Sequence, residues 1–430
     1  MKNKEIINGE AKESLPQGEF FSIDKEDFSK LIFIAKNFAR TEKEAWGRYP
    51  SGGKRYISKK NIEFILNEGD LEILATGENG GSLSFPLNRK VEKQARFNVD
   101  AKRLFRVLKA LKTLSSGEIN CGFIKKEEEK SPHDINDYFQ IKSGRFRANF
   151  RAIDRSLVTE ALVLPETEPI FTISSGDFLE VCEQVVFAGA GEEYSFGLSR
   201  VFFGVYFKIK ENQITLAATD SRRLSQKIIE GAKINRETTF IVPKKNLLSL
   251  MKILRSQKKK SGDSLSIFID HIKDKVFFSH PDFKMSAPLI EGKFPDFEKI
   301  IPQSWETKVN VRTKELLDAT RRTVSLYTPG KANVPIIVGI GNSKLEITTQ
   351  QYDYDKGIYR DKTFISIENV EIEGKEEKIC LNPIFLLDFL RSVKSKMVNF
   401  EIIHPLKPII FKPADDESYL HTIMPIRMLE

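Results

Sequence analysis

Three stretches of the chain share one pattern of apolar and polar positions, and each predicts a β-hairpin. Each reads as an apolar strand, a short polar turn and a second apolar strand that closes on a threonine: residues 62–76, 201–219 and 334–348. β-Branched and aromatic residues dominate the strands, and polar residues or glycine supply the turns. A hairpin is therefore expected at each place.

The segments around these hairpins repeat as well. A short strand and an amphipathic helix come before each hairpin: residues 20–40, 170–188 and 309–327. A strand and a second helix come after each hairpin: residues 95–114, 238–255 and 378–396. Corresponding positions recur roughly every 130 to 150 residues, which is a domain-sized period. We therefore expect three copies of one α+β domain at 18–165, 166–302 and 303–430, after a disordered leader at 1–17.

Positive charge is concentrated on the second helix of each repeat. The chain has 68 Lys and Arg residues against 60 Asp and Glu, a net charge of +8. In the helix expected at 100–115, leucines at helical spacing form a buried face and the remaining positions are basic. The helix expected at 244–257 repeats this pattern. Such a distribution is typical of sequence-independent contact with nucleic acid, although basic helices can also serve solubility alone.

The first helix of the second repeat is different. Its only charged residues are Asp177, Glu180 and Glu183. We expect that this helix does not attract phosphate by charge.

The second hairpin ends in Thr219-Asp220-Ser221, followed by two arginines. An aspartate at a strand end can accept hydrogen bonds from the backbone in an Asx turn. This predicts that Arg222, Arg223 and Leu224 project from the rim of a sheet. The alternative is an ordinary strand end with solvated arginines.

Three further segments do not fit the repeat. Residues 46–60 are basic and Gly-rich, residues 125–137 are highly charged, and both are expected to be surface loops. The C-terminal segment 418–430 alternates like a strand and remains apolar almost to the last residue. Chain ends are usually polar, so this segment should be covered by the protein or by a partner.

The sequence shows little sign of catalytic chemistry. The five His and three Cys residues have no metal-ligand spacing, and no phosphate-binding loop is present. Gly339-Ile340-Gly341 leads into a strand, which indicates a turn and not a dinucleotide site. We expect no catalytic residue, no cofactor and no metal. The scattered cysteines and the lack of a membrane-length apolar stretch indicate a cytoplasmic protein.

Several motifs carry a family resemblance. The sequence Ala-Thr-Asp-Ser-Arg-Arg-Leu at 218–224, the linker Glu-Gly-Lys-Phe-Pro-Asp-Phe at 291–297, the closing Met-Pro-Ile-Arg-Met at 424–428 and the threefold repeat resemble the bacterial DNA polymerase III beta subunits, the sliding clamps. The resemblance covers about residues 20–428. The family usually has histidine at the position of Arg222.

The resemblance implies an α+β clamp fold in which each domain packs two helices on antiparallel sheets. Two copies would form a head-to-tail homodimeric ring around duplex DNA, with no covalent chemistry and no sequence preference. The ring would act as the processivity factor in DNA replication, associated with the nucleoid. The basic residues that would line its channel are Lys102, Arg103, Arg106, Lys109, Lys112, Lys244, Lys245, Lys252, Arg255, Arg321, Arg322, Arg391 and Lys394.

The resemblance also implies a pocket between the second and third domains. DNA polymerase III and other polymerases, the clamp loader and mismatch-repair proteins would insert short peptides there. The pocket residues would be Phe202, Thr219, Arg223, Leu224, Pro295, Lys299, Ile300, Asn382, Phe385, Leu406, Pro408, Ile423, Met424, Pro425, Ile426 and Arg427. Aliphatic, Met and Pro side chains with a few polar groups suit an adaptable peptide site.

Two other interpretations remain open at this point. One is a clamp-fold paralogue that keeps the peptide pocket but forms no ring on DNA. The other is an enzyme that acts on nucleic acid, which metal-dependent turnover of DNA would support.

Overall fold

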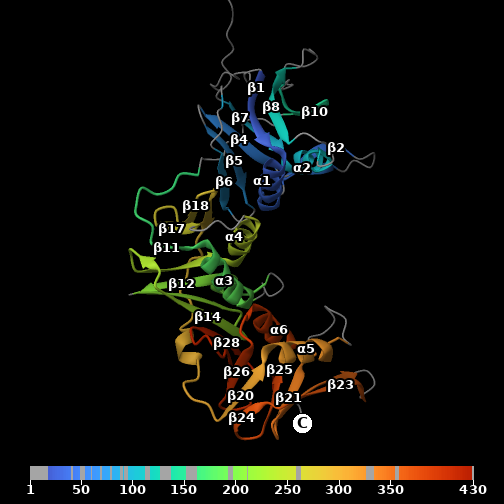
Figure 1. The fold of residues 1–430 in the computed structure, drawn as a ribbon, viewed down its shortest axis with the longest axis vertical. Helices are drawn as coiled ribbons and strands as arrows, with labels where there is room; N and C mark the ends of the chain where they lie inside the picture. Colours follow the sequence, from blue (N-terminus) through green and yellow to red (C-terminus); the bar gives the residue numbers. More distant parts are fainter. Residues whose placement is uncertain are drawn as a thin grey trace, which may run out of the picture. The chain divides into compact units, whose positions relative to one another are not determined.

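The chain divides into two units (Figure 1). The first comprises the residues up to Glu166 together with Phe277–Ala287, and the second comprises Thr167–Val276 and Pro288–Glu430. The computed structural model describes residues 18–39, 42–48, 54–59, 61–67, 70–77, 80–87, 91, 95–111, 117–125, 137–151, 162–191, 197–210, 212–257, 263–325, 334–353 and 358–428. The leader predicted at 1–17 lies outside these residues. The predicted domain bounds at 165/166 and 302/303 stay predictions.

Two antiparallel sheets form the main part of the first unit. Its strands are β1 (Gly18–Asp24), β2 (Glu42–Arg48), β3 (Lys54–Lys59), β4 (Asn61–Asn67), β5 (Asp70–Thr76), β6 (Ser82–Leu87), β7 (Ala95–Asp100), β8 (Glu118–Lys125), β9 (Asp137–Ser143) and β10 (Phe146–Arg151). One sheet has the order β1-β8-β9-β10, and in the other β6, β5, β4 and β7 lie side by side. Residues 284–286 of β19 (Phe283–Pro288) pair with β6.

Aromatic side chains from both sheets form the core of the first unit. The ring of Phe97 lies 5.0 Å from that of Phe64, 4.4 Å from Phe123 and 5.1 Å from Phe139, measured between centroids. These distances are in the range of favourable ring pairs. The four side chains come from β7, β4, β8 and β9, so the cluster joins the two sheets.

Helices α1 (Lys25–Phe38) and α2 (Ala101–Ala110) follow β1 and β7 directly. Each begins after an aspartate that accepts hydrogen bonds from the first free backbone amides: Asp24 from Glu26 and Asp27, and Asp100 from Lys102 and Arg103. The helix expected at 100–115 is therefore confirmed at its start. Residues 112–116, including the candidate channel residue Lys112, lie outside the described residues.

The expectation of a loop at 46–60 is wrong for the residues of this stretch that the structure describes, 46–48 and 54–59. Strands β2 and β3 pair with each other as a two-stranded antiparallel sheet, with a register shift between Ala45 and Gly47. The two strands pair through their backbones, a contact that the composition of the stretch does not show. The loop expected at 125–137 begins in β8 and ends in β9, and its interior lies outside the described residues.

The second unit contains the remaining elements. Its helices are α3 (Ser175–Val185), α4 (Lys244–Ser256), α5 (Thr313–Thr323) and α6 (Pro383–Ser392), with 3₁₀ helices η3 (Val186–Ala188), η5 (Arg200–Phe203) and η6 (Phe297–Ile300). Its strands are β11 (Phe171–Ser174), β12 (Gly204–Lys210), β13 (Gln213–Thr219), β14 (Arg223–Glu230), β15 (Lys233–Ile234), β16 (Thr238–Pro243), β17 (Ser264–Asp270), β20 (Thr307–Arg312), β21 (Ile336–Gly341), β22 (Lys344–Asp353), β23 (Ile358–Glu368), β24 (Glu371–Gly374), β25 (Glu377–Leu381), β26 (Met397–Ile402), β27 (Ile409–Pro413) and β28 (Tyr419–Ile423). Strand β18 (Lys275–His280) spans the boundary between the two units.

A nine-stranded sheet is the largest element of the second unit. Its order is β16-β12-β13-β14-β28-β27-β26-β20-β24, and β21, β22, β23 and β25 form a separate four-stranded sheet. At the centre, β14 pairs antiparallel with β28, with Arg223 opposite Ile423 and Leu224 opposite Thr422. Segments about two hundred residues apart in sequence are thus neighbours in one sheet.

The strand expected at 201–210 begins three residues later, because residues 200–203 form η5. Gly204 marks the change: a β-carbon there would lie 2.4 Å from Cγ2 of Ile241 and 3.0 Å from the carbonyl oxygen of Val242. No side chain fits at that distance, so only glycine lets β12 start this close to β16.

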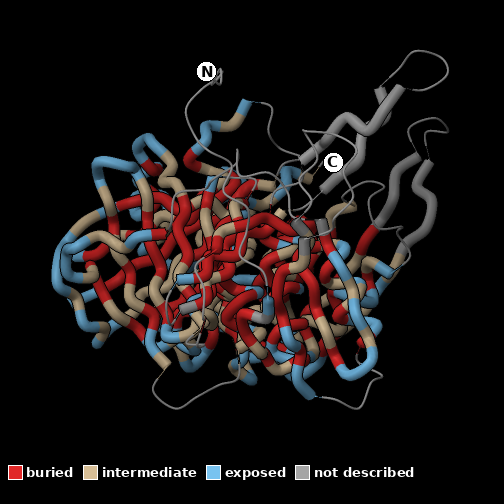
Figure 2. Tube along the Cα trace, turned by 90° about the horizontal axis from the view of Figure 1, so that it is seen from above, coloured by how far each residue is buried: buried red, intermediate tan, exposed pale blue. Residues whose placement is uncertain are grey.

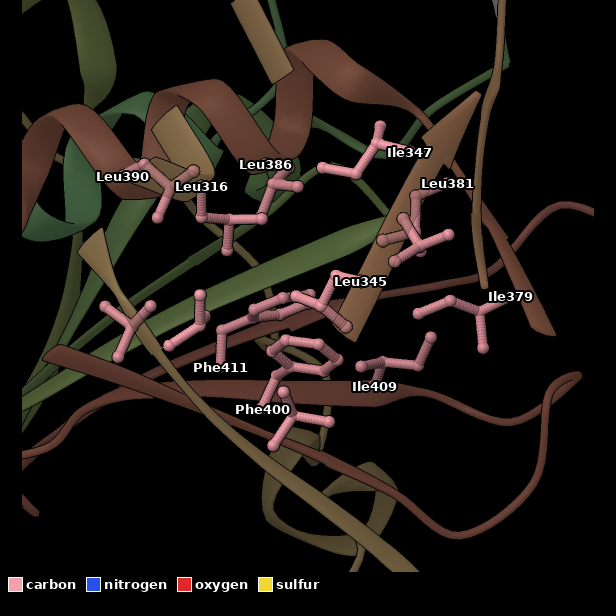
Figure 3. Close-up of a cluster of buried hydrophobic side chains, with 14 of the residues drawn as sticks. Leu316, Leu345, Ile347, Ile379, Leu381, Leu386, Leu390, Phe400, Ile409 and Phe411 are labelled. Atoms are coloured by element: carbon pink, nitrogen blue, oxygen red, sulfur yellow. The ribbon is translucent and has the colours of Figure 1, made fainter. Parts of the chain in front are cut away.

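Helices pack on these sheets through apolar side chains. Leu316, Leu386 and Leu390 meet Leu345, Phe400 and Phe411 from the strands in one buried cluster (Figure 3). Buried residues follow the strands, and exposed residues gather at the turns (Figure 2). The described part of the chain contains three packed helix pairs, α1 with α2, α3 with α4 and α5 with α6. The α+β class with paired helices on antiparallel sheets is confirmed.

Candidate functional site

The turn that follows β13 has the hydrogen bonds expected from its sequence. One carboxylate oxygen of Asp220 accepts the backbone amides of Arg222 (3.0 Å) and Arg223 (3.1 Å). The hydroxyl of Thr219 donates to the carbonyl of Arg223 and accepts the amide of Ser221. Ser221 has a φ of +73°, in the left-handed region. The predicted Asx turn is confirmed.

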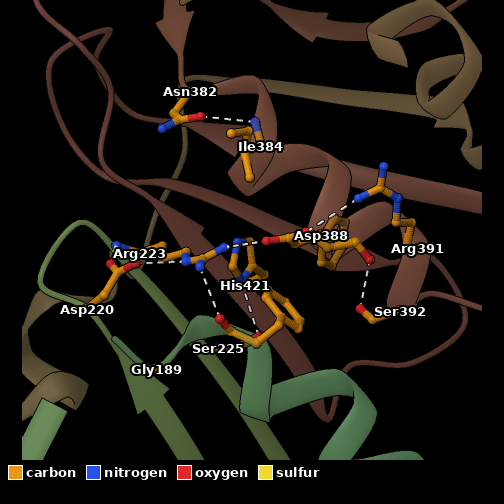
Figure 4. Close-up of polar contacts among 12 residues, drawn as sticks. Gly189, Asp220, Arg223, Ser225, Asn382, Ile384, Asp388, Arg391, Ser392 and His421 are labelled. Carbon is orange, nitrogen blue, oxygen red and sulfur yellow. Dashed lines mark hydrogen bonds and ion pairs between the residues drawn. The ribbon is translucent and has the colours of Figure 1, made fainter. Parts of the chain in front are cut away.

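Arg223 does not project from the rim as expected. Its guanidinium donates through Nε to Asp220 Oδ2 (2.9 Å), through Nη1 to Asp388 Oδ2 (2.8 Å) and through Nη2 to the carbonyl of Phe187 (3.0 Å) (Figure 4). It also lies over the ring of Phe385, 4.4 Å from the centroid. Because Asp388 and Phe385 belong to α6 and Asp220 follows β13, this guanidinium joins two distant parts of the chain.

The projection of Leu224 is also contradicted, because its side chain is only 1 % exposed. The physical reason is that β14 is not an edge: β28 pairs with it along its whole first half. Arg222 alone is exposed, and its carbonyl accepts the amide of Met424 (2.8 Å).

The apolar C-terminal segment is covered as β28, between β14 and β27. Ile423 at its end is fully buried. The chain then leaves the sheet, and the amide of Ile426 donates to the carbonyl of Cys380 (2.7 Å). Two backbone hydrogen bonds therefore hold residues 424–426 in place, while the side chains of Met424 and Ile426 stay 41 % and 38 % exposed.

The predicted pocket residues divide into a buried group and an exposed group. The buried members are Thr219, Leu224, Asn382, Phe385 and Ile423. The exposed members are Pro295, Lys299, Ile300, Leu406, Met424, Ile426 and Arg427. Phe202, Arg223, Pro408 and Pro425 are intermediate. The exposed group thus includes four large apolar side chains, Ile300, Leu406, Met424 and Ile426, and exposed apolar surface is typical of docking sites.

Packing connects part of this set directly. Leu224 belongs to one buried cluster with Phe294 and Phe297 of the linker, and Phe202 packs against that cluster. Asn382 accepts the amide of Ile384 (2.9 Å) and so begins α6. Ile384 is 48 % exposed and was not predicted. Its apolar character in the sequence could not distinguish an exposed from a buried face of a short helix.

A cavity of about 490 Å³ lies beside the predicted pocket residues. Of these residues, only Pro295 lines it. The linker segment 289–298 forms one wall, and Lys208, Phe240 and His271 contribute to the other. Tyr206 stacks on Phe294 there, with 4.9 Å between centroids. No pattern in the sequence indicated this cavity.

A buried polar chain lies behind Arg223. Ser225 Oγ donates to the carbonyl of Gln184 (2.8 Å) and lies 3.1 Å from His421 Nδ1. The hydroxyl of Ser225 has a single proton, which it donates to Gln184. In the hydrogen bond between Ser225 and His421, the donor is therefore the protonated Nδ1 of His421. Burial, with a contribution from Arg223, holds the pKa of His421 well below its usual value. His421 is therefore neutral and stacks on Phe389, 5.4 Å between centroids.

The candidate channel residues differ in how they are engaged. In the second unit, Arg255 pairs with Glu183 (2.9 Å) and Lys394 with Glu180 (2.7 Å), so the acidic helix α3 neutralises cations of its neighbours. Lys244 donates to the carbonyls of Gly189 and Phe187. These three ammonium or guanidinium groups are less suited to phosphate than their sequence indicated.

The other candidates are mostly exposed. Arg391 and Arg321 lie 3.6 Å and 3.7 Å from Asp388 and Asp318, and Arg103 lies 3.7 Å from Asp100. Arg106, Lys109, Lys245, Lys252 and Arg322 are exposed on α2, α4 and α5, and Lys102 is half-buried.

Two models of one protein family match most of the second unit, and the first of them also spans residues 277–287 of the first unit. Residues 172–296 match the DNA polymerase III beta subunit, central domain, and residues 298–427 match the DNA polymerase III beta subunit, C-terminal domain. The chain belongs to the DNA polymerase III beta subunit family. Beta sliding clamps of Staphylococcus epidermidis and Staphylococcus aureus are each 26 % identical to it, over 86 % of this chain and 90 % of theirs.

Solved structures show the same fold. The DNA polymerase III beta subunit of Thermotoga maritima (20 % identity, TM-score 0.76) and the DNA polymerase sliding clamp of Bacillus subtilis (20 % identity, TM-score 0.75) each match 96 % of this chain over their full length. The clamp fold expected from the sequence is confirmed.

Among the residues that the structure describes, no group of His, Cys, Asp and Glu side chains could hold a metal ion. Within the same residues, every helix is too short or too polar to cross a membrane. Cys121, Cys182 and Cys380 are buried and unpaired, and burial raises the pKa of each thiol.

Proposed function

We propose that this protein is a sliding clamp, a head-to-tail homodimeric ring that encircles duplex DNA and tethers replication proteins to it. The observation that carries the proposal is the match to proteins named beta sliding clamp over 86 % of the chain. Processivity then comes from topology, and the protein performs no covalent step. Basic side chains on α2, α4, α5 and α6 provide weak contacts to phosphate that permit sliding.

Ring closure uses two free strand edges. In the described residues, β10 pairs only with β9 at one end of its sheet, and β23 pairs only with β22 at one end of another. An unpaired edge is a template for a strand of a second chain. Pairing of β10 in one copy with β23 in the other is a heterologous contact that closes after two copies.

The apolar surface at β23 supports this choice of edge. Phe364 on this strand is 56 % exposed. A large ring exposed on a free edge is an aggregation risk unless a partner covers it. In the ring, the partner copy covers it.

A substitution at Phe364 tests the ring. Light scattering of the wild type across a dilution series should give about twice the chain mass of 49.2 kDa. Phe364→Arg should give the monomer mass, since a charge would be buried at the interface. The matched control is Ile272→Arg, because Ile272 is 94 % exposed on a turn of the second unit. A wild-type monomer at all concentrations, or a dimer in both variants, would overturn this interface.

Partner proteins bind the surface formed by the predicted pocket residues. DNA polymerase III, other polymerases, the clamp loader and mismatch-repair proteins are the expected partners, each through a short peptide with apolar anchors. The support is the exposure of large apolar side chains in this set, including Leu406, Met424 and Ile426. Apolar anchors of a peptide would bury these side chains, which gives affinity in proportion to the area removed from water.

A further inference from the structure

A groove between α1 and α2 in the first unit combines positive charge with exposed aromatic surface. It has a volume of about 410 Å³ and is lined by Lys36, Asn37, Lys102, Phe105, Arg106 and Lys109. Four of these six residues are basic and none is acidic. The groove thus favours an anionic occupant.

A phenylalanine that lines the groove packs against a second phenylalanine that lies beside the lining residues. Phe33 of α1 and Phe105 of α2 lie 5.2 Å apart between centroids, tilted by 43°. The ammonium of Lys36 lies 4.9 Å from the centroid of Phe33 and 4.4 Å from that of Phe105, within cation–π range. Phe33 is still 46 % exposed. The pair therefore leaves aromatic surface of Phe33 exposed beside a cluster of cations.

The helix pairs of the second unit differ in part, because some of their basic side chains are paired with acids. In the second unit, Arg255 and Lys394 are paired with the glutamates of α3. Arg106 and Lys109 have no acidic partner among the described residues. Both cations therefore remain available to a phosphate group beside the aromatic pair.

The combination of cations and exposed aromatic surface indicates which class of nucleic acid the groove binds. A duplex presents phosphates outward but keeps its bases stacked inside, so it offers nothing to a phenyl ring. Single-stranded nucleic acid presents both, and base stacking on aromatic side chains beside a basic groove is how such strands are bound. The volume of the groove lies in the usual range of small-ligand pockets, so it holds a short part of such a strand.

We propose that this groove binds single-stranded DNA, with a backbone phosphate among Lys102, Arg106 and Lys109 and an unpaired base stacked on Phe33. The choice of DNA over RNA rests on the proposed function. At a junction between duplex and single strand, such a site retains the unpaired strand while the basic side chains of α4, α5 and α6 contact the duplex.

Fluorescence anisotropy with two labelled probes tests the proposal. The probes are an oligothymidylate of about 15 nucleotides, near the upper site size of single-strand binders, and a duplex of the same length. Phe33→Ala should weaken oligothymidylate binding about fivefold or more, the effect of losing one stacked base, and leave duplex binding unchanged. Ile272→Ala is the matched control for removal of an exposed apolar side chain, and it should change neither affinity.

A second variant tests the phosphate contacts. Arg106→Gln with Lys109→Gln should reduce the salt dependence of oligothymidylate binding by about 0.7 logarithmic units for each phosphate that the variant no longer neutralises. Unchanged oligothymidylate affinity in Phe33→Ala, or an equal loss for both probes, would overturn the stacking site. Absence of wild-type binding to oligothymidylate would also overturn it, while the dimer mass would still decide the proposed ring separately, since linear probes need no ring.

Discussion

Arg223 offers the sharpest test of how the peptide site is built. Arg223→Met removes the guanidinium but keeps a long apolar stem that can still pack on Phe385. The change deletes three hydrogen bonds, to Asp220, Asp388 and the carbonyl of Phe187. The side chains of Arg223 and Asp220 are 10 % and 5 % exposed, and that of Asp388 is 25 % exposed. The two carboxylates therefore lose their partner to different extents.

These hydrogen bonds give the expected magnitude. A hydrogen bond to a charged group contributes about 1.5–3 kcal/mol, so three would sum to more than about 4 kcal/mol. Two effects reduce the sum: water can reach Asp388, and Asp220 keeps its two backbone amide donors. Removal of one member of a largely buried ion pair costs about 3–5 kcal/mol, and we expect a value in that range. Asp388→Asn keeps an acceptor oxygen and should cost only about 1 kcal/mol.

Urea unfolding of a variant with a single tryptophan measures these values in the relevant unit. The chain has two tryptophans, and Trp46→Phe leaves Trp305 as the reporter of the second unit. With a urea dependence of about 2–3 kcal/mol per M, Arg223→Met should lower the midpoint by about 1–2.5 M. The control is Arg222→Met, which changes the adjacent exposed arginine and should stay within about 0.5 kcal/mol of wild type. Equal shifts for Arg222→Met and Arg223→Met would refute the interpretation of Arg223 as a structural link.

Two other predictions follow from the same region. Met424→Ala should weaken the binding of an apolar, Gln-bearing partner peptide by about fivefold or more, because the variant buries less apolar surface against the peptide. Calorimetric titration would measure this affinity. An affinity equal to that of the Ile272→Ala control would contradict the pocket assignment. His421 has a lowered pKa in the folded state, so the unfolded chain binds a proton that the folded chain does not. Its contribution to stability is complete above the unfolded pKa of about 6.5 and falls as the pH decreases below it, by up to about 1.4 kcal/mol per pH unit. Urea unfolding between about pH 7 and pH 5 should show a shallower decline for His421→Gln than for wild type, and parallel curves would contradict the neutral buried imidazole.

Local patterns allowed the sequence to predict the elements but not their long-range contacts. The helix starts at Asp24 and Asp100 and the turn at Asp220 depend on residues within three positions, so sequence alone identifies them. The projection of Arg223 was wrong because its decisive partner, Asp388, is 165 residues away. No local pattern shows that β28 will pair with β14 and convert a rim into the middle of a sheet.

The basic groove of the first unit was missed for a related reason. Uniform positive charge on α2 was visible in the sequence, and it led to the prediction of phosphate contacts. Phe33 and Phe105 lie on separate helices, and each fits the apolar pattern of its own helix. Only their approach to 5.2 Å, with Phe33 still exposed, distinguishes an aromatic binding surface from two core residues.

The distribution of ion pairs suggests a division of tasks in the proposed clamp. A ring that slides needs contacts weak enough to exchange rapidly, and the pairs Arg255–Glu183 and Lys394–Glu180 reduce the charge available to phosphate in the second unit. The same unit contains the peptide surface, where β14 and β28 are joined in the sheet and linked through Arg223 to α6. A surface fixed in this way loses little conformational entropy when a peptide binds. Rigidity at the peptide surface and weak charge on the adjacent helices therefore serve one purpose: the partner stays bound while the clamp moves along DNA.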